Sequence, residues 1–280
     1  MTADLYCVMG NPVEHSKSPW IHARFAELTG QHLQYGKRLI ALDGFAQAVA
    51  QFRAEGGRGC NITVPFKFQA APLATQTSPR AELAQACNVL RFDGDRVFAD
   101  NTDGIGLAND IRYNAGVHLD GLDLLLVGAG GAAAGVLGPL IEARPRRIVV
   151  ANRTLSRATA LVERHAPLAG RHGVALATSG LGQVEGSYAV VINATASSMS
   201  GAEVPVPASV LKPGALAYDF MYGPAAEGFM QWARDHGAVA RDGLGMLVEQ
   251  AAEAFLLWRG VRPPSAEVLA DLQGEMARAA

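Results

Sequence analysis

The chain has 280 residues, of which 49% are hydrophobic and 18% are charged. This composition is typical of a folded globular protein and argues against a disordered chain. The formal net charge is -2, so the chain as a whole does not attract nucleic acid or an anionic membrane, and an anionic ligand needs a local binding site.

Cysteine content and the amino terminus narrow the class of protein further. Three cysteines are too few and too scattered for a disulfide framework or a zinc knuckle, and we expect them to fill apolar space. They are Cys7, Cys60 and Cys87. Residues 1–5 show no basic segment followed by an apolar run, and no apolar stretch approaches the roughly 20 residues that span a bilayer. We therefore expect a cytoplasmic protein without a metal, nucleic-acid or membrane partner.

The first part of the chain alternates short apolar runs with helical segments. Strands are predicted over residues 5–9 and 59–64, the first ending at Gly10 and the second at Pro65. A helix is predicted from Ser18 or Pro19 to about Thr29, with Ser18 as its N-cap, since serine favours the cap and proline the first helical residue. Residues 81–86 are typical of a helix and residues 88–92 of an extended segment.

A second unit begins near Asp123. Strands are predicted over residues 124–127, 147–151, 188–193 and 216–219, with an alanine-rich helix to about residue 143 after the first of them. This order indicates a β-α-β unit with further parallel strands, and therefore an α/β protein. From residue 243 to the end we predict two helices, broken at Pro263 and Pro264, that pack back on the first domain and make it discontinuous.

A dinucleotide-binding turn follows the first strand of this second unit. Residues 128–133 fit the pattern G-x-G-x-x-A, directly after a strand and at the start of a helix. Gly128 permits the tight turn, Gly130 lets the backbone approach a pyrophosphate, and Ala133 allows the helix to pack closely on the strand. The N-terminus of the helix offers free N–H groups and a positive dipole end to the anion. A glycine-rich turn without a ligand is the alternative.

The end of the next strand indicates which cofactor binds. An NAD-specific site usually places Asp or Glu there to accept a hydrogen bond from the ribose 2′-hydroxyl. This chain has Asn152 instead, followed by two arginines, Arg153 and Arg157, and two hydroxyl residues, Thr154 and Ser156. Such a set suits a dianionic 2′-phosphate, so we predict NADP. In the alternative interpretation, Asn152 or Thr154 only caps the helix and the arginines are solvated.

Polar residues gather at the predicted strand ends of the first domain. They occur in three short segments, GNPVEHSKSP from Gly10, NITVPFK from Asn61 and DNTDG from Asp100, and at Asn88. Matched hydroxyl and amide partners of this kind suit a ligand with several hydroxyls and a carboxylate. Taken singly, each residue is more typical of a cap or a turn.

Together with the segments of the second unit, these motifs resemble the shikimate dehydrogenase family. The resemblance runs in order through most of the chain. The matching segments are GNPVEHSKSP, NITVPFK, DNTDG, GAGGAAAG, NRTLSR, INAT, YDFMY and DGLGMLVEQAA. It implies a substrate domain over residues 1–103, completed by residues 246–280, and a Rossmann-type NADP domain over residues 104–245. One departure is Ala133-Ala134, where many family members carry Ser-Arg.

The resemblance also implies residue roles and a reaction, the NADPH-dependent reduction of 3-dehydroshikimate to shikimate in aromatic amino acid biosynthesis. Lys67 and Asp103 would be the catalytic pair beside the reacting carbonyl. Implied contacts to the substrate are Ser16, Ser18 and Tyr222 for the carboxylate, and Thr63, Asn88 and Gln250 for ring hydroxyls. Implied contacts to NADP are Gly128, Ala129, Gly130, Gly131 and Ala132 for the pyrophosphate, Asn152, Arg153, Thr154 and Arg157 for the adenosine phosphate, and Phe220 and Gly243 for the nicotinamide.

Two other functions remain open at this point. A quinate/shikimate dehydrogenase would accept an extra ring hydroxyl and often prefers NAD, and the Ser16 to Ser18 segment and the Asn152-Arg153 pair argue against it. A non-catalytic sensor that binds a dinucleotide and a small acid is disfavoured because both Lys67 and Asp103 are present. The enzyme is expected to be a monomer or a homodimer.

Overall fold

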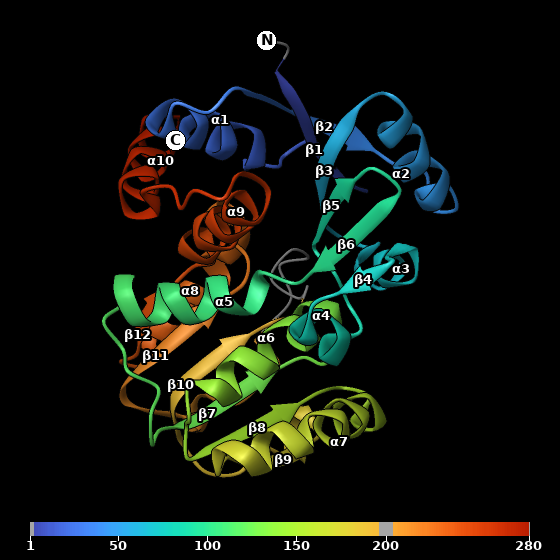
Figure 1. Ribbon diagram of the computed structural model, residues 1–280. Helices are drawn as coiled ribbons and strands as arrows, with labels where there is room; N and C mark the ends of the chain where they lie inside the picture. Colours follow the sequence, from blue (N-terminus) through green and yellow to red (C-terminus); the bar gives the residue numbers. More distant parts are fainter. Residues whose placement is uncertain (1–2, 196–203, 280) are drawn as a thin grey trace. The chain divides into compact units, whose positions relative to one another are not determined.

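The computed structural model describes residues 3–195 and 204–279. The chain forms two compact units, one made of Met1–Leu107 with Leu247–Ala280 and the other of Ala108–Met246. Figure 1 shows both units, each built on its own twisted sheet. None of the helices in the described ranges is both long and apolar enough to cross a bilayer.

The first unit is built on a mixed sheet of six strands in the order β2-β1-β3-β5-β6-β4. β1 pairs in parallel with β2 and β3, whereas β5 is antiparallel to both of its neighbours, β3 and β6. The strands are β1 (Asp4–Gly10), β2 (Leu33–Leu39), β3 (Gly57–Ile62), β4 (Gln76–Thr77), β5 (Val89–Asp93) and β6 (Arg96–Asp100). The parallel pairing brings the carboxyl ends of β1 and β3, which precede two of the polar segments, to one edge.

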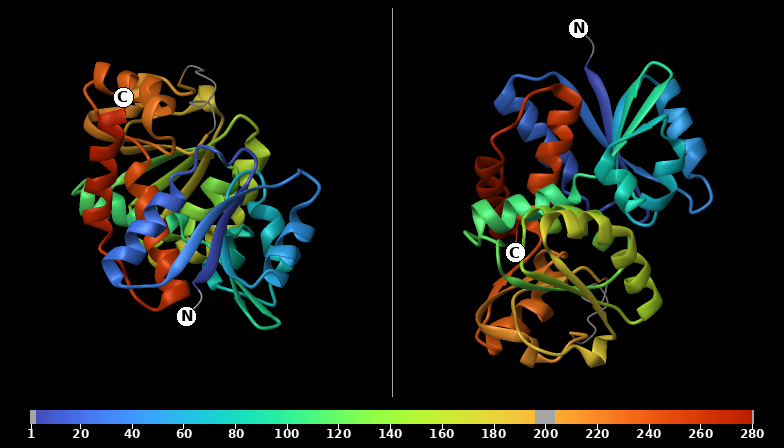
Figure 2. Two further views of the ribbon diagram at one scale, coloured as in Figure 1. Left: turned by 90° about the horizontal axis from the view of Figure 1, so that it is seen from above. Right: turned by 60° about the horizontal axis from the view of Figure 1, so that its bottom comes forward.

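The first unit also contains helices, some of which lie on each face of the sheet. They are α1 (Ser18–Thr29), α2 (Phe45–Ala54), α3 (Lys67–Ala70), α4 (Pro79–Ala84), α5 (Asp103–Asn109), α9 (Leu244–Arg259) and α10 (Ser265–Ala279). Figures 1 and 2 agree that α1, α9 and α10 lie on one side of the sheet and α2 on the other. α5 and α9 each run from one unit into the other.

The C-terminal helices complete the first unit, as the sequence predicts. Trp258 on α9 stacks on Tyr6 at 4.6 Å between ring centroids and donates a hydrogen bond from its indole nitrogen to the carbonyl of Leu90. On α10, Asp271 accepts a hydrogen bond of 2.9 Å from Arg24 of α1. An aromatic contact and a charged hydrogen bond thus hold the C-terminal helices against residues more than 160 positions earlier in the sequence.

The second unit is a six-stranded sheet that is parallel throughout. Four of its strands and their parallel order are predicted from the sequence, whereas its two edge strands, β9 and β12, are not. Its order is β12-β11-β10-β7-β8-β9. The strands are β7 (Asp123–Val127), β8 (Arg147–Ala151), β9 (Ala175–Ser179), β10 (Tyr188–Asn193), β11 (Leu211–Asp219) and β12 (Val239–Arg241). Counted within the unit this is the order 3-2-1-4-5-6 of dinucleotide-binding sheets, whose strand order reverses beside β7.

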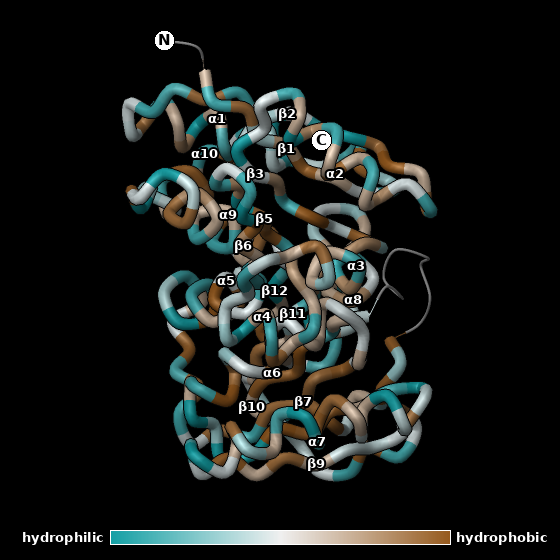
Figure 3. The backbone as a smooth tube through the Cα atoms, turned by 45° about the vertical axis from the view of Figure 1, so that its right-hand side comes forward, coloured by the Kyte–Doolittle hydropathy of each residue, from teal (hydrophilic) through white to brown (hydrophobic). Residues whose placement is uncertain are grey.

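Helices α6 (Gly131–Glu142), α7 (Leu155–His172) and α8 (Glu227–Asp235) cover this sheet. β7 is buried along its whole length, and Figure 3 shows hydrophobic residues along it and along β10. A strand that is buried on both faces forms a continuous apolar run, which is the pattern of residues 124–127.

The structure corrects several predicted boundaries. β3 ends at Ile62 rather than Val64, because after it the chain turns and the N–H of Phe66 bonds to the carbonyl of Thr63. The helix predicted over residues 81–86 begins earlier, at Pro79, because Ser78 caps it by accepting from the N–H of Ala81.

The predicted N-cap of α1 is also wrong. Ser18 is the first residue of the helix, and Lys17 occupies the cap position without a side-chain hydrogen bond. The side chain of Ser18 interacts instead with that of Ser16, with 3.2 Å between the two oxygens. At the other end the predicted stop is right, because Gly30 closes the helix in the left-handed conformation with φ of 65°.

A buried ion pair holds the chain segment that follows α5 within the second unit. Asp110 opens a π-helical turn and is fully buried. Its carboxylate accepts two hydrogen bonds from Arg241 at 2.8 and 2.6 Å and one from the hydroxyl of Tyr218 at 2.7 Å. Hydrogen bonds to the Asp110 carboxylate raise the pKa of the Arg241 guanidinium, which therefore stays protonated. A Cβ at Gly245 would lie 1.8 Å from Asp110 Oδ1, so only glycine fits there.

Arg241→Ala tests this anchor. The substitution leaves the Asp110 charge buried and uncompensated, and we expect the free energy of unfolding to fall by about 3–5 kcal/mol. Arg234→Ala removes an exposed pair with Glu227 and serves as the control, with a change of at most about 1 kcal/mol. Chemical denaturation measures both. Equal, small losses in the two variants would contradict the assigned role of Arg241.

Candidate active site

The two residues predicted as a catalytic pair lie in direct contact. Lys67 begins α3, just after the turn that follows β3, and Asp103 begins α5. The distance from Lys67 Nζ to Asp103 Oδ2 is 2.5 Å. The aspartate side chain is 6% exposed and the lysine side chain 17%. The lysine side chain is therefore partly exposed, whereas its carboxylate partner is buried.

Asn88 holds the carboxylate of Asp103 from the other side. Its side-chain amide donates to Asp103 Oδ1 at 2.8 Å, and its amide oxygen accepts from the backbone N–H of Thr102 at 2.8 Å. The N–H of Asp103 donates to Asn101 Oδ1 at 3.1 Å. The DNTDG segment thus forms a small network in which each of these buried polar groups has a partner, as a buried group requires.

Gln250 reaches the same network from α9. Its side-chain oxygen lies 3.3 Å from the amide nitrogen of Asn88. The approach is close because residue 106 of α5 is glycine, where a Cβ would lie 2.6 Å from the backbone nitrogen of Gln250. A glycine in the third position after Asp103 therefore lets α9 bring the Gln250 side chain to Asn88.

Other predicted substrate residues lie at the carboxyl ends of β1 and β3. Ser16 and Ser18 approach each other, and Ser18 is buried while Ser16 is half-buried. Thr63 directly follows β3, and its N–H donates to the carbonyl of Met9 on β1. A Cβ at Gly10 would lie 2.3 Å from the Thr63 side chain, so a glycine at the end of β1 leaves room for the threonine.

This arrangement suits a definite chemistry. An ammonium can donate a proton to a developing oxyanion, and a carboxylate fixed beside it keeps the ammonium oriented. The surrounding hydroxyls and amides can pair with the hydroxyls of a polar ligand.

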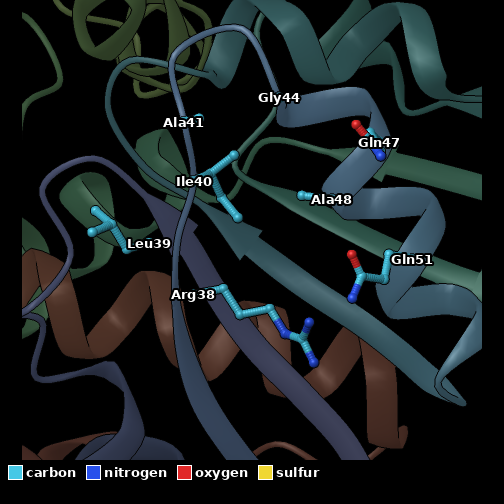
Figure 4. A pocket seen from close by; sticks show the side chains of 8 residues that line it. All are labelled: Arg38, Leu39, Ile40, Ala41, Gly44, Gln47, Ala48 and Gln51. Carbon is cyan, nitrogen blue, oxygen red and sulfur yellow. The ribbon is translucent and has the colours of Figure 1, made fainter.

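A cavity of about 420 Å³ lies elsewhere in the first unit, between the end of β2 and α2. Figure 4 shows residues that line it, among them Arg38, Gln47 and Gln51. None of the predicted site residues lines that cavity.

The glycine-rich turn of the second unit has the backbone that a pyrophosphate needs. Gly128 follows β7 with φ of 112°, a conformation that favours glycine. At Gly130, the N-cap of α6, a Cβ would meet no atom within 4 Å among residues 3–195 and 204–279. Ala133 and Ala134 are both buried. Ala129, Gly131 and Ala132 complete the turn.

The residues after β8 are positioned for a phosphate. Asn152 donates from its side-chain amide to the carbonyl of Thr154 at 2.8 Å, which closes the turn into α7. Thr154 is the N-cap but makes no side-chain cap bond, so its hydroxyl is not used by the helix. Arg153 and Arg157 are exposed, and neither guanidinium is paired with another of the described residues.

Phe220 and Gly243, predicted for the nicotinamide end, come together in the second unit. A Cβ at Gly243 would lie 2.3 Å from the carbonyl oxygen of Phe220, and the N–H of Gly243 donates to the carbonyl of Met221 at 2.8 Å. Tyr222 lies in the same loop, in the second unit, whereas Ser16 and Ser18 belong to the first.

Sequence reasoning matched the INAT and YDFMY segments but assigned their buried polar residues no role. Asn193 at the end of β10 donates to Asp219 Oδ2 at 3.0 Å, and Asp219 Oδ1 accepts from the N–H of Met221 at 2.8 Å. Both side chains are buried. They fix the loop that carries Phe220. Their position at the ends of adjacent parallel strands is the signal that could have identified them.

Comparison with known proteins agrees with this geometry. Models of three domains match the chain: the shikimate dehydrogenase substrate binding domain over residues 8–90, shikimate / quinate 5-dehydrogenase over residues 111–202, and the shikimate 5′-dehydrogenase C-terminal domain over residues 243–273. A shikimate dehydrogenase (NADP(+)) of Acidovorax sp. (strain JS42) is 66% identical over 278 residues, which cover 99% of each chain. The chain belongs to the shikimate dehydrogenase family.

Solved structures place the fold in the same family. An Ael1 enzyme from Pseudomonas putida is 45% identical, with a TM-score of 0.86 over 96% of this chain and 98% of its own. A shikimate 5-dehydrogenase from Thermus thermophilus, solved in complex with NADP(H) and shikimate, is 30% identical, with a TM-score of 0.84 over 95% and 97%. The predicted resemblance to shikimate dehydrogenases and the predicted α/β fold are confirmed.

Proposed function

We propose that this protein catalyses the reversible NADPH-dependent reduction of 3-dehydroshikimate to shikimate, a step in the synthesis of aromatic amino acids. The contact between Lys67 and Asp103, braced by Asn88, carries the proposal. It supplies a proton donor, a fixed carboxylate and a polar surround in a chain that belongs to the shikimate dehydrogenase family.

The first unit would bind the substrate. Ser16 and Ser18 offer two neighbouring hydroxyls at the start of α1, which suit the substrate carboxylate, and Tyr222 would assist them. Thr63, Asn88 and Gln250 offer a hydroxyl and two amides to the ring hydroxyls. A ligand hydroxyl that loses water needs such a partner, because an unpaired buried polar group costs about 1–3 kcal/mol.

Lys67 would act as the general acid in the reductive direction. When the carbonyl carbon receives a hydride, the negative charge that develops on its oxygen is neutralised by a proton from the Lys67 ammonium, which leaves a neutral amine. In the oxidative direction the amine takes the hydroxyl proton. Asp103 would accept a hydrogen bond from Lys67 Nζ in both charge states and so direct the nitrogen toward the reacting oxygen.

The second unit would bind NADP, which supplies or accepts the hydride when bound. Gly128 to Ala132 and the N-terminus of α6 suit the pyrophosphate. Asn152, Arg153, Thr154 and Arg157 suit the adenosine 2′-phosphate, since they provide two cations and no carboxylate at the end of β8. Phe220 and Gly243 would line the nicotinamide end.

We propose that the enzyme acts in the cytoplasm, and the state of its cysteines supports this. Cys7, Cys60 and Cys87 are free and buried. Burial raises the pKa of Cys7 and of Cys87 to about 12, so both remain as unreactive thiols. Free thiols without a disulfide are usual in a reducing compartment.

An absorbance assay at the NADPH band tests the proposed function. Shikimate and quinate are each supplied with NADP and with NAD, and initial rates are compared. We expect the highest kcat/KM for the combination of shikimate and NADP, because the two arginines at the end of β8 favour the 2′-phosphate and the serine segment favours shikimate. Faster oxidation of quinate would indicate a different dehydrogenase, and tight NADPH binding without turnover would indicate a sensor.

Lys67→Ala tests the general acid. We expect kcat to fall by roughly 10²–10⁴-fold, the scale of losing an acid–base group. Lys212→Ala removes a lysine from β11 that belongs to no proposed site and serves as the control, with kcat unchanged. Steady-state kinetics in the oxidative direction measures both variants. If Lys67→Ala retains the original kcat, Lys67 has no part in proton transfer.

Arg153→Ala tests the choice of cofactor. Its guanidinium would pair with the 2′-phosphate, which only NADPH carries, so we expect KM to rise at least about tenfold for NADPH and to change little for NADH. Arg171→Ala, at the exposed C-terminal end of α7, the helix that follows Arg153, is the control and should change neither value. Equal increases for the two cofactors would show that Arg153 does not distinguish them.

A further inference from the structure

A tyrosine outside every sequence motif touches the polar network of the candidate site. Tyr35 lies on the edge strand β2, and its hydroxyl donates to Asn61 Oδ1 at 2.7 Å. Its ring stacks on that of His22, with 4.3 Å between centroids and 5° between planes. His22 belongs to α1, the helix that begins at Ser18.

Asn61 continues this contact toward the catalytic pair. It lies on β3 and is buried. Its side-chain amide donates to the backbone carbonyl of Asn88 at 3.2 Å, and the side chain of Asn88 in turn donates to Asp103. The Tyr35 hydroxyl is therefore connected through two hydrogen bonds to Asn88, the residue that holds the Asp103 carboxylate.

The charge states of the groups around Tyr35 are fixed by burial. Burial raises the pKa of Tyr35 well above its ordinary value, and a hydrogen bond with Ser18 lowers it only in part, so the hydroxyl keeps its proton. Burial lowers the pKa of His22 to about 3, which leaves the stacked ring neutral at physiological pH. Tyr35 is therefore a permanent donor with a fixed ring.

We propose that Tyr35 is a positioning residue. It connects α1, which begins at Ser18 beside the proposed carboxylate site, to Asn61 and Asn88, of which Asn88 is proposed to bind a ring hydroxyl. Its hydroxyl holds the amide of Asn61 in one orientation, and the ring is held by His22. Without the hydroxyl, the buried oxygen of Asn61 loses its donor and the amide can turn, which loosens Asn88. This inference rests on the proposed function.

Tyr35→Phe tests the proposal, since it removes the hydroxyl and keeps the ring on His22. Tyr6→Phe is the matched control, because Tyr6 lies on β1 of the same unit, stacks on Trp258, and contacts Arg259 through its hydroxyl. The experiment measures kcat and both KM values for shikimate and NADP, with thermal unfolding to compare the stability of the two variants.

We expect Tyr35→Phe to lower kcat/KM for shikimate about fivefold, the scale of one lost hydrogen bond. The loss should lie mainly in KM for shikimate, with KM for NADP unchanged, whereas Tyr6→Phe should change none of the three. A kcat/KM within twofold of the unaltered enzyme, or an equal loss in both variants, overturns the positioning role. Unaltered protein that does not oxidise shikimate overturns the proposed function itself, and with it this inference.

Discussion

The proposed chemistry of this protein depends on one interaction, the contact between the ammonium of Lys67 and the carboxylate of Asp103. Removing two charges from water is costly, and only good geometry with further hydrogen bonds offsets that cost. Here the second carboxylate oxygen is satisfied by Asn88, and the backbone of Asp103 is fixed by Asn101. The Lys67 side chain remains partly exposed, at 17%. Under the proposed function, this exposure would let a reacting oxygen reach the lysine.

In both units, residues of the proposed sites lie just beyond the carboxyl ends of parallel strands. In the first unit Thr63 follows β3, and the serine segment follows β1. In the second, Gly128 follows β7 where the strand order reverses, and Asn152 follows β8. Ligands bind at such ends because helix N-termini and loops meet there. The buried anchor of Asp110 to Arg241 fixes the segment after α5, the helix that begins with Asp103.

Local signals made part of this structure predictable. The glycine turn at Gly128 lies between an apolar run and an alanine-rich helix. The strand before the turn and the helix after it together identify the turn as a dinucleotide-binding one. The pairing of Lys67 with Asp103, 36 residues apart, is predicted only by the family resemblance, because no periodicity links two such positions.

The predicted N-cap of α1 is wrong because a serine before proline suits a cap, whereas Ser18 is the first residue of the helix and its side chain contacts that of Ser16. Tyr35 and β2 were missed, since a half-exposed edge strand such as Leu33–Leu39 lacks an apolar alternation.

A crystal structure of the protein with shikimate and NADP would show whether Lys67 and Asp103 act on the substrate. We expect the substrate hydroxyl that is oxidised to lie within hydrogen-bond distance of both Lys67 Nζ and the Asp103 carboxylate, about 2.6–3.2 Å from each. We also expect the amide of Asn88 to contact a ring hydroxyl. A shikimate ring bound away from Lys67, or a Lys67 that leaves Asp103 when the ligands bind, would contradict the proposed chemistry.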